Sequence, residues 1–237
     1  MDRAVIAPGG YPPTRVVSVS EAVARHRSVR SFLDRPVDRE KVLDILRRAA
    51  RAPSGGNLQP WVITTIDGQR LSDLKALMRG RCSQHPDGEP LDFAFYPSPL
   101  KPAYLGRRMR NGEILYGALG IDRNDALARR IWIHENFQFF GAPFGVFCFL
   151  ERNFEAYQWL DLGIYLQTVL LLLTEAGYAS CPQADWAMFE RTVKHFLNSP
   201  PDLRLVCGIA IGYPDEARPE NLCRTERDDP LQSYEIR

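Results

Sequence analysis

Pro53-Ser54-Gly55-Gly56-Asn57-Leu58-Gln59-Pro60-Trp61 joins a helical pattern to a strand pattern, and the rest of the fold can be worked out from it. Before it, Asp38 can cap a helix whose apolar residues recur at helical spacing, and this helix must end near Pro53, because a residue that precedes proline disfavours helical geometry. After it, the β-branched run 62–66 indicates a strand that turns at Asp67-Gly68. The stretch is therefore predicted to connect a helix to a strand.

Helical patterns dominate the remaining sequence. Three strands are predicted, at 62–66, 144–150 and 203–212, and long helical stretches separate them. This arrangement is typical of an α+β or mixed α/β protein with a small sheet. A length of 237 residues fits one domain, 1–237, better than two. The predicted helices cover about 18–27, 38–52, 71–78, 107–119, 122–134, 159–176 and 187–196.

Charge and composition exclude several classes of protein. The sequence has 30 Lys and Arg against 29 Asp and Glu, so its net charge is too small to attract nucleic acid or an anionic membrane. Any anion must therefore be bound by local groups. The first ten residues lack a secretory signal pattern, and the apolar stretch 163–174 is shorter than the roughly 20 residues of a membrane span. Five cysteines without a C-x-x-C pair favour reduced thiols. We therefore expect a soluble, cytoplasmic protein.

Two regions have no clear place in the core pattern. The excursion at about 81–119 contains a proline-rich, aromatic-rich part, and loops of such length in compact domains are usually functional or disordered. Its aromatic residues from Phe93 to Tyr116, with Trp132 and Phe137, are a hypothesis for a substrate wall. A lid core or a subunit contact explains them equally well. The tail after Pro214 has no core pattern and needs another surface, for which a partner subunit is the obvious candidate.

Arginines are paired at two places in the chain. Arg27 and Arg30 flank Ser28 at the predicted end of the first helix, and three-residue spacing would place both guanidiniums on one side. Arg224 and Arg227 have the same spacing in the tail. A guanidinium suits a phosphate because its planar fork donates two parallel bonds. The alternatives are a solvated basic helix end for the first pair and surface ion pairs for the second.

Small residues and amides define the other two candidate segments. Residues 53–56 carry no side chain larger than proline, and Asn57 and Gln59 follow with amides that can match the donors and acceptors of a flat ring. An ordinary helix-to-strand connection would have the same composition. After Pro182, Gln183 and Ala184 lead into a predicted helix whose first backbone N–H groups are free for a ligand. The alternative is a plain helix start capped by Asp185, with Cys181 as a buried thiol.

Several motifs are absent from the sequence. It contains no G-x-G-x-x-G, no G-x-x-x-x-G-K-[ST] and no G-x-S-x-G, which argues against a built-in dinucleotide fold, a nucleoside triphosphate loop and a serine hydrolase. Its histidines and cysteines show no metal-ligand spacing, so no metal site is predicted. A redox cofactor other than a tightly held dinucleotide remains open.

The ordered set of these segments resembles the nitroreductase family of flavoproteins, and the likeness covers nearly the whole chain. It implies a three-layer α-β-α fold with a small central sheet and an extended, swapped C-terminal tail. It also implies a homodimer with two FMN sites at the interface. The segments that carry it are 27–32, Pro36-Val37, 45–46, 53–61, 136–143, 161–163, 177–183 and 208–214.

The resemblance also implies roles for individual residues. The first arginine motif would hold the FMN phosphate and ribityl chain, the loop would come from the other subunit, and the segment after Cys181 would place a backbone N–H near the flavin ring. One of the two tail arginines would meet the phosphate. The matching residues are Arg27, Ser28 and Arg30; Pro53, Ser54, Gly55, Asn57 and Gln59; Pro182, Gln183 and Ala184; and Arg224 and Arg227.

The activity implied by the resemblance is reduction of nitroaromatic or related electron-poor compounds with NADH or NADPH, by a ping-pong mechanism. Since the flavin carries the chemistry, no side chain is predicted to be catalytic. Other activities on the same fold are reductive dehalogenation, enone or quinone reduction and flavin fragmentation. A flavin-binding protein without turnover is the alternative from another class.

Overall fold

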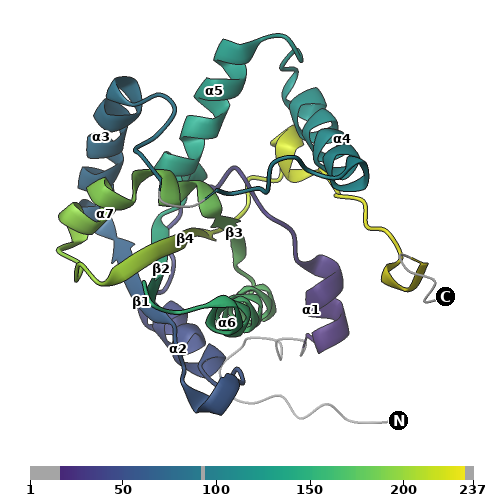
Figure 1. Ribbon diagram of the computed structural model, residues 1–237. Coiled ribbons are helices and arrows are strands. Elements are labelled where there is room, and N and C mark those ends of the chain that lie inside the picture. Colours follow the sequence, from purple (N-terminus) through teal and green to yellow (C-terminus); the bar gives the residue numbers. More distant parts are fainter. Residues whose placement is uncertain (1–16, 92–93, 233–237) are drawn as a thin grey trace, which may run out of the picture.

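The computed structural model describes residues 17–91 and 94–232 (Figure 1). Its centre is a four-stranded antiparallel sheet of order β1-β2-β4-β3. The strands are β1 (Val62–Asp67), β2 (Phe144–Glu151), β3 (Ala179–Gln183) and β4 (Leu203–Gly212). The three predicted strands are confirmed in place. The prediction missed β3, a five-residue edge strand, because Pro182 interrupts the strand signal; an edge strand tolerates proline.

Helices cover both faces of the sheet, which gives three layers (Figure 1). On one face lie α2 (Arg39–Ala49) and α6 (Ala156–Glu175), with α1 (Val19–Arg25) packed against α6. The other face is covered by α3 (Gly68–Gln84), α7 (Glu190–Leu197) and the 3-10 segments η2 (Glu135–Gly141) and η3 (Ala184–Phe189). Because both faces are covered, β2 is almost continuously apolar rather than alternating. The fold is the predicted α+β architecture.

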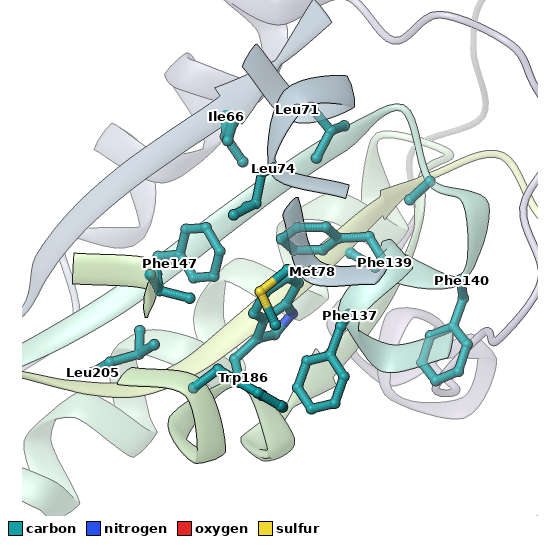
Figure 2. Close-up of a cluster of buried hydrophobic side chains, with 14 of the residues drawn as sticks. Ile66, Leu71, Leu74, Met78, Phe137, Phe139, Phe140, Phe147, Trp186 and Leu205 are labelled. Atoms are coloured by element: carbon teal, nitrogen blue, oxygen red, sulfur yellow. The ribbon is translucent and has the colours of Figure 1, made fainter. Parts of the chain in front are cut away.

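Aromatic side chains fill the core beneath α3 and η3 (Figure 2). Trp186 is fully buried and packs against Phe137, Phe139 and Phe147. Gly208 makes room for it, since a Cβ there would overlap Cδ1 of Trp186. Phe137 is therefore a core residue. The hypothesis from the sequence that it belongs to a substrate wall is not supported.

The core on the opposite face lies between the sheet and helices α2 and α6. Val42, Ile45 and Ala49 of α2 are buried, as their helical spacing predicted. Tyr165 of α6 stacks on Trp61 with ring centroids 4.9 Å apart, and its hydroxyl donates to the carbonyl oxygen of Leu46. The end of α2, the start of β1 and the middle of α6 are thereby fixed together.

The excursion is more regular than the sequence suggested. It contains the end of α3, an irregular connection and α4 (Pro102–Leu119), which begins at a proline five residues before the predicted start. Proline is favourable at the first turn of a helix, where its missing N–H has no partner to lose. None of the described residues of α4 is buried. With α5 (Ala126–His134), α4 projects from the sheet domain (Figure 1).

Helix α6 combines a buried and an exposed apolar face. Among the described residues it is the helix long and apolar enough to cross a membrane by length and composition, but it packs on the sheet, α1 and α2. On its other side Tyr157 is 78% exposed and Leu160 is 60% exposed. The prediction of a central helix is confirmed for the packed side, and the subunit interface stays a prediction for the exposed side.

Candidate functional site

The first arginine motif lies on extended backbone and not at a helix end. Helix α1 ends at Arg25, two residues earlier than predicted, and the chain then runs beside β3. Ser28 forms an isolated parallel bridge with Ser180, and the N–H of Val29 donates to the carbonyl oxygen of Ser180 at 3.0 Å. The expected helical geometry for the two guanidiniums is therefore wrong, and the motif instead continues the edge of the sheet beyond β3.

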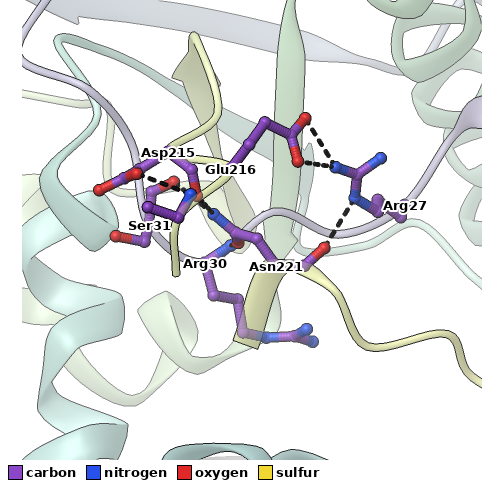
Figure 3. Close-up of polar contacts among 7 residues, drawn as sticks. Arg27, Arg30, Ser31, Asp215, Glu216 and Asn221 are labelled. Atoms are coloured by element: carbon purple, nitrogen blue, oxygen red, sulfur yellow. Dashed lines mark hydrogen bonds and ion pairs between the residues drawn. The ribbon is translucent and has the colours of Figure 1, made fainter. Parts of the chain in front are cut away.

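Arg27 is engaged by the tail (Figure 3). Its Nε donates to the carbonyl oxygen of Asn221 at 2.9 Å. Its Nη2 donates to both carboxylate oxygens of Glu216, at 2.9 and 2.8 Å. An anionic ligand at Nη2 of this guanidinium would compete with Glu216.

Arg30 is the freer of the two guanidiniums. It is partly buried, and within the described part of the chain its hydrogen bond is a long one of 3.4 Å to the carbonyl oxygen of Ser28. Its positive charge opposes the effect of burial, which raises the pKa of the Asp185 carboxyl. Burial likewise raises the pKa of Glu135, which lines a cavity of ≈ 550 Å³ with Arg30 and Trp132. A cation in such partly desolvated surroundings is suited to hold an anionic group.

Asn221 connects the motif to the tail and was not identified from the sequence. It is 1% exposed, and its Oδ1 accepts from the N–H of Arg30 at 2.8 Å. Its Nδ2 donates to the carbonyl oxygens of Ser31 and Asp215 at 2.8 and 2.9 Å. Figure 3 shows these bonds converging on the one side chain. No local sequence signal marks it, because its partners in the arginine segment, Arg30 and Ser31, lie about 190 residues away.

The segment after Cys181 alternates between buried and exposed residues. Pro182 and Ala184 are exposed, whereas Gln183 is buried. The Gln183 amide donates to the carbonyl oxygen of Asn136 at 2.8 Å and accepts from Nε1 of Trp186 at 3.3 Å. Gln183 therefore anchors the segment through the core, and a ring placed on it would meet backbone and the small Ala184 side chain.

Two details of this segment differ from expectation. The helix predicted from Ala187 begins as the 3-10 segment η3 at Ala184, and its N-cap is Gln183, with no side-chain cap; Asp185 is not the capping residue. The prediction that Cys181 is a buried thiol is confirmed. Burial raises the pKa of its thiol to about 11, while Arg30 and a hydrogen bond with Ser28 act in the opposite direction. The thiol therefore stays protonated at neutral pH and is not an activated nucleophile.

The small-residue loop is held in an unusual conformation. The N–H of Gly55 donates to both carboxylate oxygens of the buried Asp161, at 3.2 and 3.1 Å. Asn57 and Gln59 have left-handed φ values of 58° and 50°, which are uncommon for residues with side chains. The N–H of Gln59 donates to Oγ of Ser54 at 3.0 Å. Strained backbone of this kind tends to occur at functional sites, and here it presents two exposed amides.

The structure brings some of the predicted residues together and leaves others apart. Arg27, Ser28 and Arg30 lie beside the β3 edge and are tied to the tail that leads to Arg224 and Arg227. Both tail arginines are exposed. The predicted loop instead precedes β1 and is bonded to Asp161 of α6. None of its residues lines the cavity at Arg30; the loop residues are Pro53, Ser54, Gly55, Asn57 and Gln59. Within the described residues of one chain, the predicted site residues therefore form two separate groups.

These two groups fit a flat anionic cofactor. Arg30 supplies a partly buried cation, and Pro182 and Ala184 are exposed residues with no bulky side chain. The loop supplies amides on a backbone that can approach a ring closely. By contrast, the described residues contain no group of three or more His, Cys, Asp and Glu that could hold a metal ion. The chemistry of the donor set is that of a nucleotide-like cofactor.

Comparison with known proteins agrees with this chemistry. Residues 23–213 match the model of the nitroreductase family. The chain is 37% identical to a 4-nitrobenzoate reductase of Pseudomonas putida, over 87% of this chain and 89% of that protein. It is 34% identical to a nitrobenzene nitroreductase of Ectopseudomonas oleovorans, over 86% and 89%.

A solved structure is similar over almost the whole fold. The FMN and NADPH-dependent nitroreductase NfnB from Sphigopyxis sp. strain HMH superposes with a TM-score of 0.88 at 41% identity. The match covers 93% of this chain and 99% of that one. NfnB from Mycobacterium smegmatis, solved in complex with NADPH, matches with a TM-score of 0.84 at 30% identity, over 93% and 100%.

Proposed function

This chain belongs to the nitroreductase family, and on that premise we propose that it is an FMN-dependent nitroreductase that reduces nitroaromatic or related electron-poor compounds with NAD(P)H. The observation that carries the proposal is the Arg30 guanidinium, partly buried and without a carboxylate partner among the described residues, near a segment in which Pro182 and Ala184 are exposed. Bound there, FMN would take up reducing equivalents from NAD(P)H and release them to the acceptor in a second half-reaction.

The residues of this chain bind and orient the cofactor. Arg30 and Ser28 would hold the phosphate and ribityl chain, and Arg27 would join them if Glu216 gives up its ion pair. Pro182, Gln183 and Ala184 would face the ring through their backbone. Gln183 keeps that edge rigid through Asn136 and Trp186. No side chain is assigned a proton-transfer role, since the nearby thiol of Cys181 remains neutral.

We further propose that the active unit is a homodimer in which the loop completes the partner's site. The exposed apolar residues of α1 and α6 support an interface, because Val19 and Val23 of α1 and Tyr157 and Leu160 of α6 are exposed on two helices that pack together. The separation of the loop from Arg30 within one chain has the same implication. Pro53, Ser54, Gly55, Asn57 and Gln59 would then contact the flavin of the other subunit.

The tail and the location in the cell complete the proposal. Arg224 and Arg227 follow Asn221, so the tail arginines start from a point fixed to the phosphate-binding segment. All five cysteines are free thiols, which suits a cytoplasmic protein. With a formal net charge of +1, the chain has no general attraction for nucleic acid or an anionic membrane.

Spectroscopy tests the function directly. We expect purified protein to be yellow, to bleach when NADPH is added without air, and to regain its colour when a nitroarene is added. Flavin that neither NADH nor NADPH can reduce would refute the reductase assignment.

The cofactor site is tested by substitution. Arg30→Ala should lower FMN affinity at least tenfold, since a charge-assisted hydrogen bond contributes about 1.5–3 kcal/mol. Arg27→Ala should lower it less, because Glu216 already occupies that guanidinium. Arg39→Ala is the matched control, since Arg39 forms exposed ion pairs with Glu40 and Asp67. Equal flavin content in all three variants would refute the phosphate role.

A further inference from the structure

We propose that the cavity between α4 and the C-terminal tail binds the adenosine 2′-phosphate end of NADPH, which makes the enzyme prefer NADPH to NADH. The inference rests on the proposed function and assigns a place to its reductant. The cavity has a volume of ≈ 760 Å³, within the range of small-molecule sites. Figure 1 shows the tail running beside α4, and the residues of the two segments form the cavity walls.

Two ion pairs hold the tail against α4. Arg107 pairs with Asp228, with 2.6 Å between Nε and Oδ2. Arg110 pairs with Glu226 at 3.1 Å. These contacts involve both carboxylates of the cavity lining, so each negative charge near a bound phosphate is already compensated. Because the pairs are exposed, they contribute little to the free energy of unfolding, and their effect is to position the tail.

Two further arginines of the lining have no carboxylate partner in residues 17–91 and 94–232. Arg108 lies over the ring of Tyr96, with its guanidinium carbon 4.3 Å from the ring centroid. Arg227 donates from Nη1 to the carbonyl oxygen of Glu226 at 2.8 Å. The lining therefore carries four arginines against two carboxylates, an excess of positive charge in a chain that is nearly neutral overall. Such a cavity favours an anion with several oxygens.

The combination of guanidiniums and an aromatic ring suits a phosphorylated adenosine. A base can stack on Tyr96 or on the guanidinium plane of Arg108, and the phosphate can accept paired bonds from Arg108 and Arg227. NADPH carries a phosphate where NADH carries a hydroxyl, and arginine is the residue that commonly accommodates this group. The site would therefore discriminate between the two reductants by charge.

The cavity adjoins the proposed flavin half-site. Asn221 fixes the tail to Arg30, and two residues later Sγ of Cys223 contacts the carbonyl oxygen of Ile114 on α4 at 3.8 Å. Arg227 lines the cavity and Arg224 does not. The geometry thus separates the two tail arginines, with Arg224 left for the FMN phosphate and Arg227 for the reductant.

The test compares the two reductants in the flavin-loaded enzyme. Arg108→Gln and Arg227→Gln should each lower kcat/KM for NADPH about tenfold while kcat/KM for NADH changes less than twofold, as expected for loss of one charge-assisted bond. The variants should also weaken inhibition by adenosine 2′-monophosphate. Arg48→Gln, which removes an exposed arginine of α2 paired with Glu175, is the control. It should leave kcat/KM for NADPH and kcat/KM for NADH unchanged.

Three results would overturn the inference. The first is an equal loss with NADPH and NADH. The second is an unchanged reductant preference with a changed preference between 4-nitrobenzoate and nitrobenzene, which would assign the cavity to an anionic acceptor. The third is loss of FMN from either variant, which would assign it to the flavin phosphate. Calorimetric titration of the purified protein with adenosine 2′-monophosphate measures binding to the cavity even if no nitroarene is reduced. Failure of the proposed activity can therefore be distinguished from failure of this inference.

Discussion

Asn221 shows how much of the site depends on a single buried amide. Its side chain bonds the backbone of Arg30, Ser31 and Asp215, and its own carbonyl oxygen accepts from Arg27. Both sides of the amide are used, so isosteric Asp would lose the two donated bonds and Ala would lose all three side-chain bonds. The arginine segment and the tail are held in register by this residue.

Asn221→Ala is expected to lower the free energy of unfolding by about 2–4 kcal/mol and to weaken FMN binding, because it leaves buried backbone groups unpaired. Urea unfolding at fixed protein concentration and fluorescence titration of FMN measure the two effects. Asn198→Gly is the control: Asn198 ends α7 with φ 56°, which glycine adopts readily, so little change is expected. Normal stability and FMN affinity in Asn221→Ala would show that the tail is held in another way.

Cys181 allows a prediction about pH. Burial raises the pKa of its thiol from 9.0 to about 11, so between these values the folded state retains a proton that the unfolded state releases. The free energy of unfolding should therefore fall as the pH rises from 9 to 11, and this contribution is fully present below pH 9. In Cys181→Ala the slope should be shallower by up to about 1.4 kcal/mol per pH unit. An unchanged slope in urea unfolding would contradict the assignment.

The residue types of the site could be predicted, but their contacts could not. Guanidiniums near residues 27–30 and small residues in the 53–59 loop were apparent from the sequence alone. That Glu216 engages Arg27, and that Asp161 holds Gly55, depends on residues 189 and 106 positions away. Local patterns contain no information about such pairs, because the path of the chain between them is set by packing.

At the scale of elements, a strong apolar periodicity was sufficient to predict a helix or a strand. Short segments could not be predicted in this way. Helix α2 and strands β1, β2 and β4 were predicted from their apolar patterns. Strand β3 has five residues, one of them proline, and it is formed by pairing with residues 208–212 of β4, a partner that no local pattern reveals. The 3-10 segment η3 likewise follows from the packing of Trp186, a tertiary effect that overrides local propensity.

Gly208 tests this packing. Gly208→Ala should lower the free energy of unfolding by about 3 kcal/mol, because the new methyl group would overlap the buried Trp186 ring on a close-packed sheet. Gly80→Ala is the matched control, since Gly80 lies in α3 and the methyl group added there would have no atom within 4 Å other than those of its own helix backbone and chain neighbours. It should raise stability by about 0.5–1 kcal/mol through helix propensity. Thermal unfolding of both variants measures the difference, and equal effects would contradict the packing argument.

At the scale of the whole molecule, the α+β class followed from strands separated by long helical stretches, and the three-layer arrangement followed from the resemblance. The prediction that the site is divided between two subunits did not follow from any local pattern and came only from the resemblance. The structure adds the reason, since the 53–59 loop is bound to α6 through Asp161, while Arg30 lies beside β3. Two rigid attachments keep these groups apart within one chain.

Subunit exchange tests whether a second chain joins the halves. One variant is Arg30→Ala, and the other carries Asn57→Gly and Gln59→Gly, since glycine fits their left-handed backbone while removing the amides. Each variant alone should bind FMN poorly. In an exchanged mixture, each heterodimer would contain one intact site, so about a quarter of the wild-type sites should return for statistical mixing of a two-fold dimer. Flavin content after exchange is the measurement, and no recovery would indicate that both halves act within one chain.

The burial of Trp186 also has an optical consequence. Its indole is shielded from water and bonded to Gln183, next to the backbone proposed to face the flavin. An indole in such apolar surroundings emits at shorter wavelength than a solvated one, and its emission overlaps the absorption of oxidised flavin. Energy transfer should therefore dim this tryptophan as FMN binds and restore it when the flavin is bleached. Trp186 would then report cofactor occupancy and redox state, and Trp186→Phe would remove its part of the signal while leaving that of the other three tryptophans.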